Sequence, residues 1–435
     1  MNLCGKAGFA VMVKKKITSG KITALFVAAC WMAYSFSYIG RLNFSASMAE
    51  MTNSGVLLKS EAGAVTTGFF ICYGLGQFLS GWLGDKVPPR YLVFAGLACS
   101  SLLNLAISFE PPYILLIMLW SANGLSQALL WAPICRIVSD RVMTERRQKA
   151  CTALATTMAG GTFFAYMLSA LLISASGWKA SFICGSFCTM FAAVVWIIVT
   201  TKIEKDTDKN GAIEERPVMV NEDTGEAVPH DEIPSNFIKL LLVSGLMTLA
   251  IASGVQGILK DCMSTWVPTF ISDMFEMSPV VSILTGALLP VFGLFGPYIA
   301  NRFMVKTRDE LSSLFMLFVI SSCALAMLAL FGRFSLVVSI VALAVTYACS
   351  LGQNMFIVGN IPMYFHNVGK VSMITGSLNA VACLSTAVMS WVTGALVDTA
   401  GWGIVMNIWL ILSAVAAVSV IFAKRRWNKF RRNLF

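Results

Sequence analysis

The chain has 435 residues with a net charge of +10; 57% of the residues are hydrophobic and 12% are charged. A soluble domain has roughly 25% charged residues, so the composition excludes an ordinary soluble enzyme or binding domain. A positive net charge can indicate nucleic-acid binding, but the placement of Lys and Arg described below explains it, and no nucleic-acid partner is expected.

Apolar runs recur along the chain, and a helix of about 20 apolar residues crosses a bilayer core of ~30 Å. The strands of a β-barrel would instead be short and alternate in polarity. The sequence therefore predicts an all-α membrane protein with twelve transmembrane helices, at residues 22–49, 61–84, 90–109, 112–138, 149–174, 178–201, 237–271, 279–301, 310–331, 334–360, 371–396 and 401–423.

The placement of Lys and Arg predicts the orientation, because cytoplasmic loops are enriched in these residues. When the N-terminus is placed in the cytoplasm, nearly all Lys and Arg outside the helices fall in cytoplasmic segments. The outer loops then hold only Lys59, Lys179 and Arg333. Both termini are therefore expected in the cytoplasm, and the net charge is mostly a signal of topology.

The first predicted helix contains an arginine, Arg41, in the stretch YSFSYIGRLNFSASM. A charge in lipid costs at least about 2.5–3.5 kcal/mol, so an arginine at this depth indicates a functional site. Tyr34, Tyr38 and Arg41 are spaced i, i+4 and i+7, and they therefore share one helix face. We expect this face to bind the substrate.

Further polar side chains lie on other predicted helices: Tyr73 on the second, Gln127 in the middle of the fourth and Asn354 deep in the tenth. A deep amide either contacts a substrate or hydrogen-bonds to a neighbouring helix, and the sequence leaves both roles open for Gln127 and Asn354. Arg136 lies near the cytoplasmic end of the fourth helix, where a structural or gating role fits better.

Residues 202–236 are polar, acidic and turn-rich, which is typical of a solvated linker. This linker divides the chain into an N-terminal six-helix half, residues 1–201, and a C-terminal six-helix half with a basic tail, residues 237–435. The halves share short patterns: SGWKASF opens the sixth predicted helix and AGWGIVM opens the twelfth. Parallel repeats of six helices are typical of transporters whose halves rock around a central site.

The seventh predicted helix contains a second deep cation, Lys260. It lies 21 residues after Lys239, as Arg41 lies 20 residues after Lys21, so the two cations are expected at similar depth in the two halves. The alternative is a structural ion pair with Asp261, but adjacent residues on a helix do not face each other. Two cations against one anion also leave a positive charge. The planar fork of arginine and the point charge of lysine suit a phosphate dianion.

Four stretches resemble the organophosphate:phosphate antiporter family of the major facilitator superfamily. They are YIGRLNFSASM for its first helix, CYGLGQFLSGWLGD for its second, NGLSQALLWAPICR for its fourth and KDCMSTWVPTF for its seventh. The resemblance implies that Arg41 and Lys260 bind phosphate, and that Tyr34, Tyr38 and Tyr73 are site tyrosines.

The sequence GWLGDKVPPR resembles the loop signature between the second and third helices of the same superfamily, with matches at Gly81, Gly84, Asp85 and Arg90. The resemblance implies that this loop helps to latch the cytoplasmic ends of the helices. We expect a structural and gating role for these residues.

Together these patterns predict a secondary transporter that exchanges a phosphorylated organic anion, of the sugar phosphate or glycerol phosphate type, for inorganic phosphate by alternating access. Thr157 stands where the glycerol phosphate carriers of the family have a histidine, which argues against glycerol 3-phosphate itself. Two alternatives stay open: a proton-coupled carboxylate symporter, with Asp261 as its coupling residue, and a transporter-like membrane sensor of sugar phosphate.

The sequence contains no GxxxxGK[ST] motif and no paired catalytic residues, so we expect no ATP hydrolysis, no enzymatic activity, no cofactor and no metal. The expected partners are a small anionic substrate, inorganic phosphate and the lipid bilayer, and a monomer suffices for this architecture. The resemblance and the short loops indicate a bacterial cytoplasmic (inner) membrane.

Overall fold

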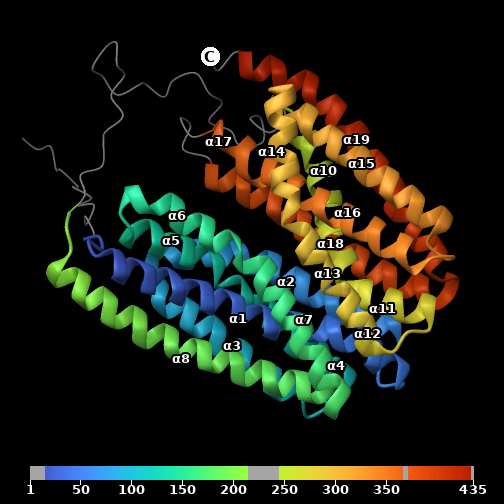
Figure 1. Cartoon of the computed structure of the whole chain (residues 1–435), viewed down its shortest axis with the longest axis horizontal. Coiled ribbons are helices and arrows are strands. Elements are labelled where there is room, and N and C mark those ends of the chain that lie inside the picture. Colours follow the sequence, from blue (N-terminus) through green and yellow to red (C-terminus); the bar gives the residue numbers. More distant parts are fainter. Residues whose placement is uncertain (1–14, 214–243, 366–370, 433–435) are drawn as a thin grey trace, which may run out of the picture.

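A computed structural model describes residues 15–213, 244–365 and 371–432. It is almost entirely helical (Figure 1). The first half of the chain contains α1 (Gly20–Asn53), α2 (Lys59–Lys86), α3 (Pro89–Ile107), α4 (Tyr113–Ala128), α5 (Trp131–Arg141), α6 (Thr144–Ala155), α7 (Thr157–Ser176) and α8 (Trp178–Asn210).

The second half contains two π-helical segments among its α-helices. Its elements are α10 (Leu246–Gly257), η1 (Ile258–Cys262), α11 (Met263–Phe275), α12 (Pro279–Gly286), α13 (Leu288–Gly293), α14 (Phe295–Thr307), α15 (Glu310–Phe331), α16 (Leu336–Asn354), η2 (Met355–Asn360), α17 (Ile361–Met363), α18 (Val371–Ala400) and α19 (Trp402–Arg432).

Ten helical segments of the described residues are long and apolar enough to cross a membrane. Two further segments have a similar length: α2, with 28 residues, and the continuous run α10–η1–α11. With these two, the long helices match the twelve predicted from the sequence, and the all-α prediction is confirmed. Several of these long helices are interrupted by short breaks: α4 continues into α5, and α12 continues into α13 and α14.

The outer surface of the bundle is apolar. On α8, Phe187, Phe191 and Ile198 have exposed fractions of 69%, 59% and 60%, and similar side chains lie exposed along α3, α15 and α19. A water-soluble helix bundle would turn such side chains inward. In this chain they face outward because the surrounding solvent is lipid, and the protein is therefore a multi-pass integral membrane protein.

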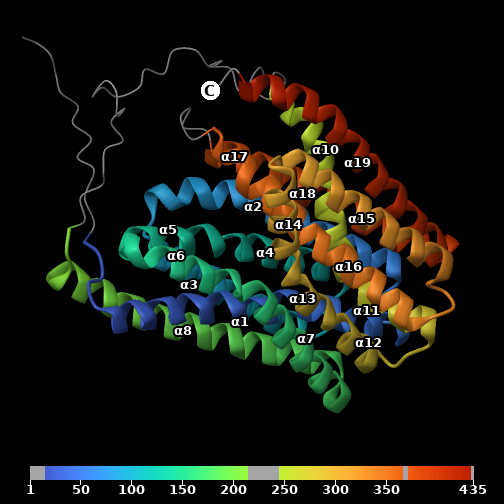
Figure 2. The ribbon, with the colours of Figure 1, turned by 45° about the horizontal axis from the view of Figure 1, so that its top comes forward.

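The start of α1 and the end of α8 lie at one end of the molecule, which we call the proximal end (Figure 2). There the backbone of Lys16 pairs with Ala212, and Ile17 pairs with Val142. The end of α19 lies on the same side of the bundle. Residues 214–243, which connect the halves and contain most of the predicted linker, lie outside the described residues, so the predicted domain boundaries remain a prediction.

The two halves meet mainly where α2 packs along α18, α1 against α11, and α7 against α12 and α13. The contact of α2 with α18 is close because of glycine: a Cβ atom on Gly63 would lie 2.8 Å from the carbonyl oxygen of Ser390. Small residues allow membrane helices to approach in this way. The interface thus brings α1 and α2 of one half next to α11 and α18 of the other.

The polar contacts described between the halves lie at the level of η1 or farther from the proximal end. At the far end, which we call the distal end, Lys59 Nζ pairs with Asp273 Oδ2 at 2.7 Å. Nearby, the backbone N–H of Ser60 donates to Asp398 Oδ2 at 2.7 Å. Carboxylates of the C-terminal half therefore hold the start of α2 and join the halves at this end.

Candidate substrate site

Arg41 lies on α1 beside three aromatic rings. Its guanidinium carbon is 4.5 Å from the ring centroid of Tyr73, and 5.7 Å from those of Tyr38 and Phe69. Cation–π contacts of this kind stabilise a desolvated guanidinium by about 2 kcal/mol. Because ring faces carry no net charge, they hold the arginine in the membrane without neutralising it, and its charge stays available to an anion.

Lys260 lies across from Arg41 on the π-helical segment η1. Its Nζ atom is 3.2 Å from Asp261 Oδ2, so these neighbours do form an ion pair. The expectation that they would face apart was wrong, because it assumed α-helical geometry. In η1 the N–H of Met263 donates to the carbonyl of Ile258, five residues earlier, and this wider turn reduces the angle between successive side chains.

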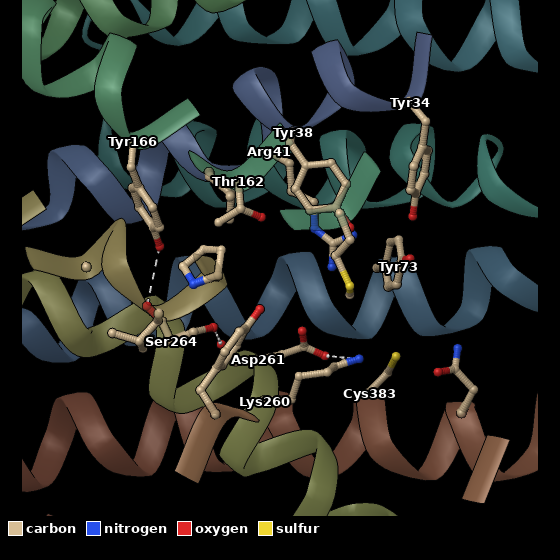
Figure 3. A pocket seen from close by; sticks show the side chains of 17 residues that line it. Tyr34, Tyr38, Arg41, Tyr73, Thr162, Tyr166, Lys260, Asp261, Ser264 and Cys383 are labelled. Carbon is tan, nitrogen blue, oxygen red and sulfur yellow. Dashed lines mark hydrogen bonds and ion pairs between the residues drawn. The ribbon is translucent and has the colours of Figure 1, made fainter. Parts of the chain in front are cut away.

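Arg41, Lys260 and Asp261 line one cavity of about 130 Å³ between the halves (Figure 3). A water molecule occupies about 30 Å³ of the liquid, so the cavity has room for several waters or a small polyatomic anion. Two cations and one carboxylate give this lining a formal charge of +1 among the described residues. The other described residues of the lining are Tyr34, Tyr38, Leu42, Tyr73, Met158, Thr162, Tyr166, Ser264, Gly286, Leu289, Pro290, Tyr347, Asn379 and Cys383.

The structure brings six predicted site residues to this cavity: Tyr34, Tyr38, Arg41, Tyr73, Lys260 and Asp261. Tyr34 and Tyr38 contact each other edge to face, with centroids 5.4 Å apart. These rings form a wall of the cavity beside Arg41.

Gln127 and Asn354 are not part of this lining. The amide of Gln127 donates to the carbonyl of Ser37 at 3.2 Å and to Ser100 Oγ at 2.9 Å. Gln127 therefore joins α4 to α1 and α3, which is the helix-joining role that the sequence left open. Asn354 lies at the C-terminal end of α16, outside the cavity.

Two tyrosines that the sequence analysis did not select, Tyr166 and Tyr347, also line the cavity. The hydroxyl of Tyr166 on α7 donates to the carbonyl of Ser264 at 3.4 Å. Next to it, Ser45 Oγ on α1 donates to the carbonyl of Thr265 at 2.6 Å. These hydrogen bonds join the halves on the distal side of the cavity. No spacing pattern marks these residues in the sequence, since each stands alone in an apolar run.

The predicted gating residues lie near the proximal end. Arg90 pairs with Glu204 on α8, with Nη1 to Oε2 at 2.8 Å, and Arg136 lies 3.8 Å from Asp140 one turn later. The side chains of the predicted latch residues Gly81, Gly84 and Asp85 lie outside the described residues. The latch itself therefore remains a prediction.

A model of the Major Facilitator Superfamily matches residues 30–388 of the chain. The chain belongs to the major facilitator superfamily. Among known relatives, a probable hexose phosphate transport protein of Chlamydia trachomatis is 22% identical over 302 residues, which are 67% of this chain and 65% of that protein. The chain thus spans about two thirds of that relative. The membrane sensor protein UhpC of Escherichia coli is 20% identical, and the alignment covers 90% of this chain and 89% of that protein.

Solved structures agree with this fold. A bacterial homologue of the human lysosomal transporter Spinster, in an inward-facing and occupied conformation, superposes with a TM-score of 0.70 at 13% identity, and the match covers 94% of this chain and 98% of that chain. At this identity the similarity establishes the fold alone. The curated relatives are consistent with the resemblance to the organophosphate:phosphate antiporters that the sequence motifs indicate.

Proposed function

We propose that this protein is a secondary transporter of a small phosphorylated metabolite. It binds the phosphoryl group of the metabolite between its two halves and exchanges the metabolite for inorganic phosphate across the membrane. The observation that carries the proposal is that one cation from each half, Arg41 and Lys260, lines the same cavity. The name of one curated relative, a probable hexose phosphate transport protein, supports the same class of ligand.

In this mechanism the guanidinium of Arg41 donates two parallel hydrogen bonds to phosphoryl oxygens, and the ammonium of Lys260 donates from the other half. Tyr38 and Tyr73 hold Arg41 in place through their ring faces. An anion that contacts both cations draws the halves together, and the cavity then opens to the other side of the membrane. Arg90 and Arg136, near the proximal end, are assigned to structure and gating, and Gly81, Gly84 and Asp85 to the latch.

The same proposal includes the two six-helix halves at residues 1–201 and 237–435, the predicted linker at 202–236, of which residues 202–210 extend α8 as a helix, and an inner-membrane location with both termini in the cytoplasm. In that orientation, the distal contact of Lys59 with Asp273 closes the outer side. The cavity would then be reached from the cytoplasm. A monomer contains both cations and is sufficient for the exchange.

The test is uptake of labelled phosphate by proteoliposomes preloaded with unlabelled phosphate, compared with empty vesicles. We expect uptake in the loaded vesicles alone, and loss of uptake in Arg41→Ala and Lys260→Ala. Lys179→Ala is the matched control, because it also removes a cation but from an exposed outer pair with Glu110. Labelled phosphate that fails to enter loaded vesicles in a monodisperse preparation would refute the exchange.

Two other functions are favoured by particular observations. Asp261 lines the cavity, as a proton-coupled carboxylate symporter would require. Uptake of a labelled carboxylate into empty vesicles under a proton gradient would support that function. The match to a membrane sensor over 90% of the chain favours a sensor, for which labelled sugar phosphate would bind to the protein without crossing the membrane.

A further inference from the structure

Asp261 occupies an unusual position in this cavity. Its carboxylate is held by Lys260 at 3.2 Å, and the exposed fractions of the two side chains are 22% and 13%, respectively. Asp261 also lines an adjoining cavity of about 40 Å³, together with Arg41 and Ser264. Its carboxylate therefore stands at the junction of two cavities, directly beside one of the two cations proposed to bind the anion (Figure 3).

The groups around Asp261 include cations and hydroxyls but no second described carboxylate in the lining. The nearby hydroxyls of Ser264 and Thr265 donate to the backbone carbonyl of Asp261, so these hydrogen bonds do not stabilise its carboxylate. The titratable groups of the elements packed around it are Arg41, Tyr34 and Tyr38 from α1, Tyr73 from α2, Tyr166 from α7, Lys260 and Cys262 from η1, Tyr347 from α16 and Cys383 from α18.

The charges do not balance when a phosphoryl dianion enters. Without ligand, Arg41, Lys260 and ionised Asp261 sum to +1. A dianion changes the sum to −1, and its oxygens also compete with the carboxylate for the ammonium of Lys260. A carboxylate that loses its cation and gains a dianion beside it in a water-poor site is strongly destabilised. One proton on that carboxylate restores a net charge of zero.

Resting on the proposed function, we propose that Asp261 takes up one proton when a phosphoryl dianion binds to Arg41 and Lys260, so that the site carries the dianion and the proton together. The carboxylate gains the proton as it leaves Lys260, and the carboxyl group returns the proton when the dianion leaves and Lys260 pairs with it again. The transported unit has one negative charge, whichever side of the membrane the site faces.

A second location for the proton must be distinguished, namely the phosphate itself. Binding of the monoanion from a pool of dianion takes up a proton too, but independently of Asp261. The neutral variant Asp261→Asn separates the two cases, since its amide resembles the protonated carboxyl in size and charge. The conservative variant Asp261→Glu retains a titratable group.

The experiment is a calorimetric titration of the full-length protein in detergent with inorganic phosphate at pH 8, where phosphate is mostly the dianion. It is repeated in two buffers of different ionisation heat to count protons. We expect about one proton per bound phosphate in the wild type and in Asp261→Glu, and none in Asp261→Asn, with binding retained. Sulfate, a dianion at every pH used, is the second probe. The Kd of sulfate for the wild type should increase by up to tenfold for each pH unit between pH 7 and 9. In Asp261→Asn the Kd should stay constant over this range.

The outcomes separate this inference from the proposed function. If wild-type protein binds no phosphate, the proposed function fails and the inference fails with it. If phosphate binds without proton uptake, or with equal uptake in Asp261→Asn, the inference alone is refuted. A well-folded Asp261→Asn that cannot bind phosphate also refutes the inference, because the inference requires only a neutral residue at position 261 for phosphate to bind. If Asp261→Asn does not fold, Asp261→Ala provides the same comparison.

Discussion

Replacing Arg41 with lysine separates the charge of the site from its geometry. Arg41→Lys keeps a cation at this depth, so the electrostatic cost of inserting α1 into the membrane is unchanged. The variant loses the planar fork that can donate two parallel bonds to a phosphoryl group. It also loses the stacked position over Tyr73, where the guanidinium carbon is 4.5 Å from the ring centroid.

The size of the effect follows from these two losses. One charge-assisted hydrogen bond contributes about 1.5–3 kcal/mol, and lysine keeps part of the cation–π energy. We therefore expect Arg41→Lys to weaken phosphate binding by roughly 2 kcal/mol, which is about 30-fold in Kd. Lys260→Arg, which adds a fork on the other side, should cost less.

The assay is competition of unlabelled phosphate against labelled phosphate on purified protein, with exchange in proteoliposomes as the second readout. Thermal unfolding in detergent controls for folding. An Arg41→Lys variant within about threefold of wild type, combined with an inactive Arg41→Ala, would mean that charge alone binds the anion. Full activity of Arg41→Ala would refute the site as a whole.

Two further predictions concern the ends of the bundle. Lys59→Ala removes the 2.7 Å distal pair with Asp273, and a pair of this kind contributes about 0.5–1 kcal/mol. The rate at which a cysteine introduced at Ser264 is labelled from the distal side should therefore rise about two- to fivefold. An unchanged labelling rate would mean that the pair does not hold this side closed. Burial raises the pKa of Asp309, which caps α15, but hydrogen bonds from the hydroxyl and N–H of Ser312 outweigh this and leave the pKa below its ordinary value. The cap therefore stabilises the protein above the ordinary pKa of about 3.9 and loses its effect as the pH falls through the lower folded value. Asp309→Ala should cost about 1 kcal/mol at pH 7 and less at pH 3 in thermal unfolding, whereas an equal cost at both pH values would contradict the assignment.

Much of the site follows from sequence because helical periodicity fixes which side chains share a face. Tyr34, Tyr38 and Arg41 were expected on one face from their spacing, and all three line the cavity. The pairing of Lys260 with Asp261 could not be predicted in this way. It depends on the π-helical hydrogen bonds of η1, and no residue pattern in that stretch distinguishes a π-helical turn from an α-helical one.

The amides show a second limit. Gln127 fits both a ligand role and a helix-joining role at the level of sequence. In the structure its amide hydrogen-bonds to Ser37 and Ser100, which favours the helix-joining role. Tyr166 and Tyr347 were missed for the opposite reason. A single tyrosine in an apolar helix resembles any other buried aromatic residue until the packing of the two halves places its hydroxyl beside the cavity.

The most direct test of the central claim is an experimental structure of the protein with phosphate bound. The account predicts density for one phosphate between the halves, with oxygens within about 3 Å of both the guanidinium of Arg41 and the ammonium of Lys260, and with Asp261 moved away from Lys260. Phosphate bound elsewhere, or a phosphate that touches only one of the two cations while Lys260 stays paired with Asp261, would contradict it.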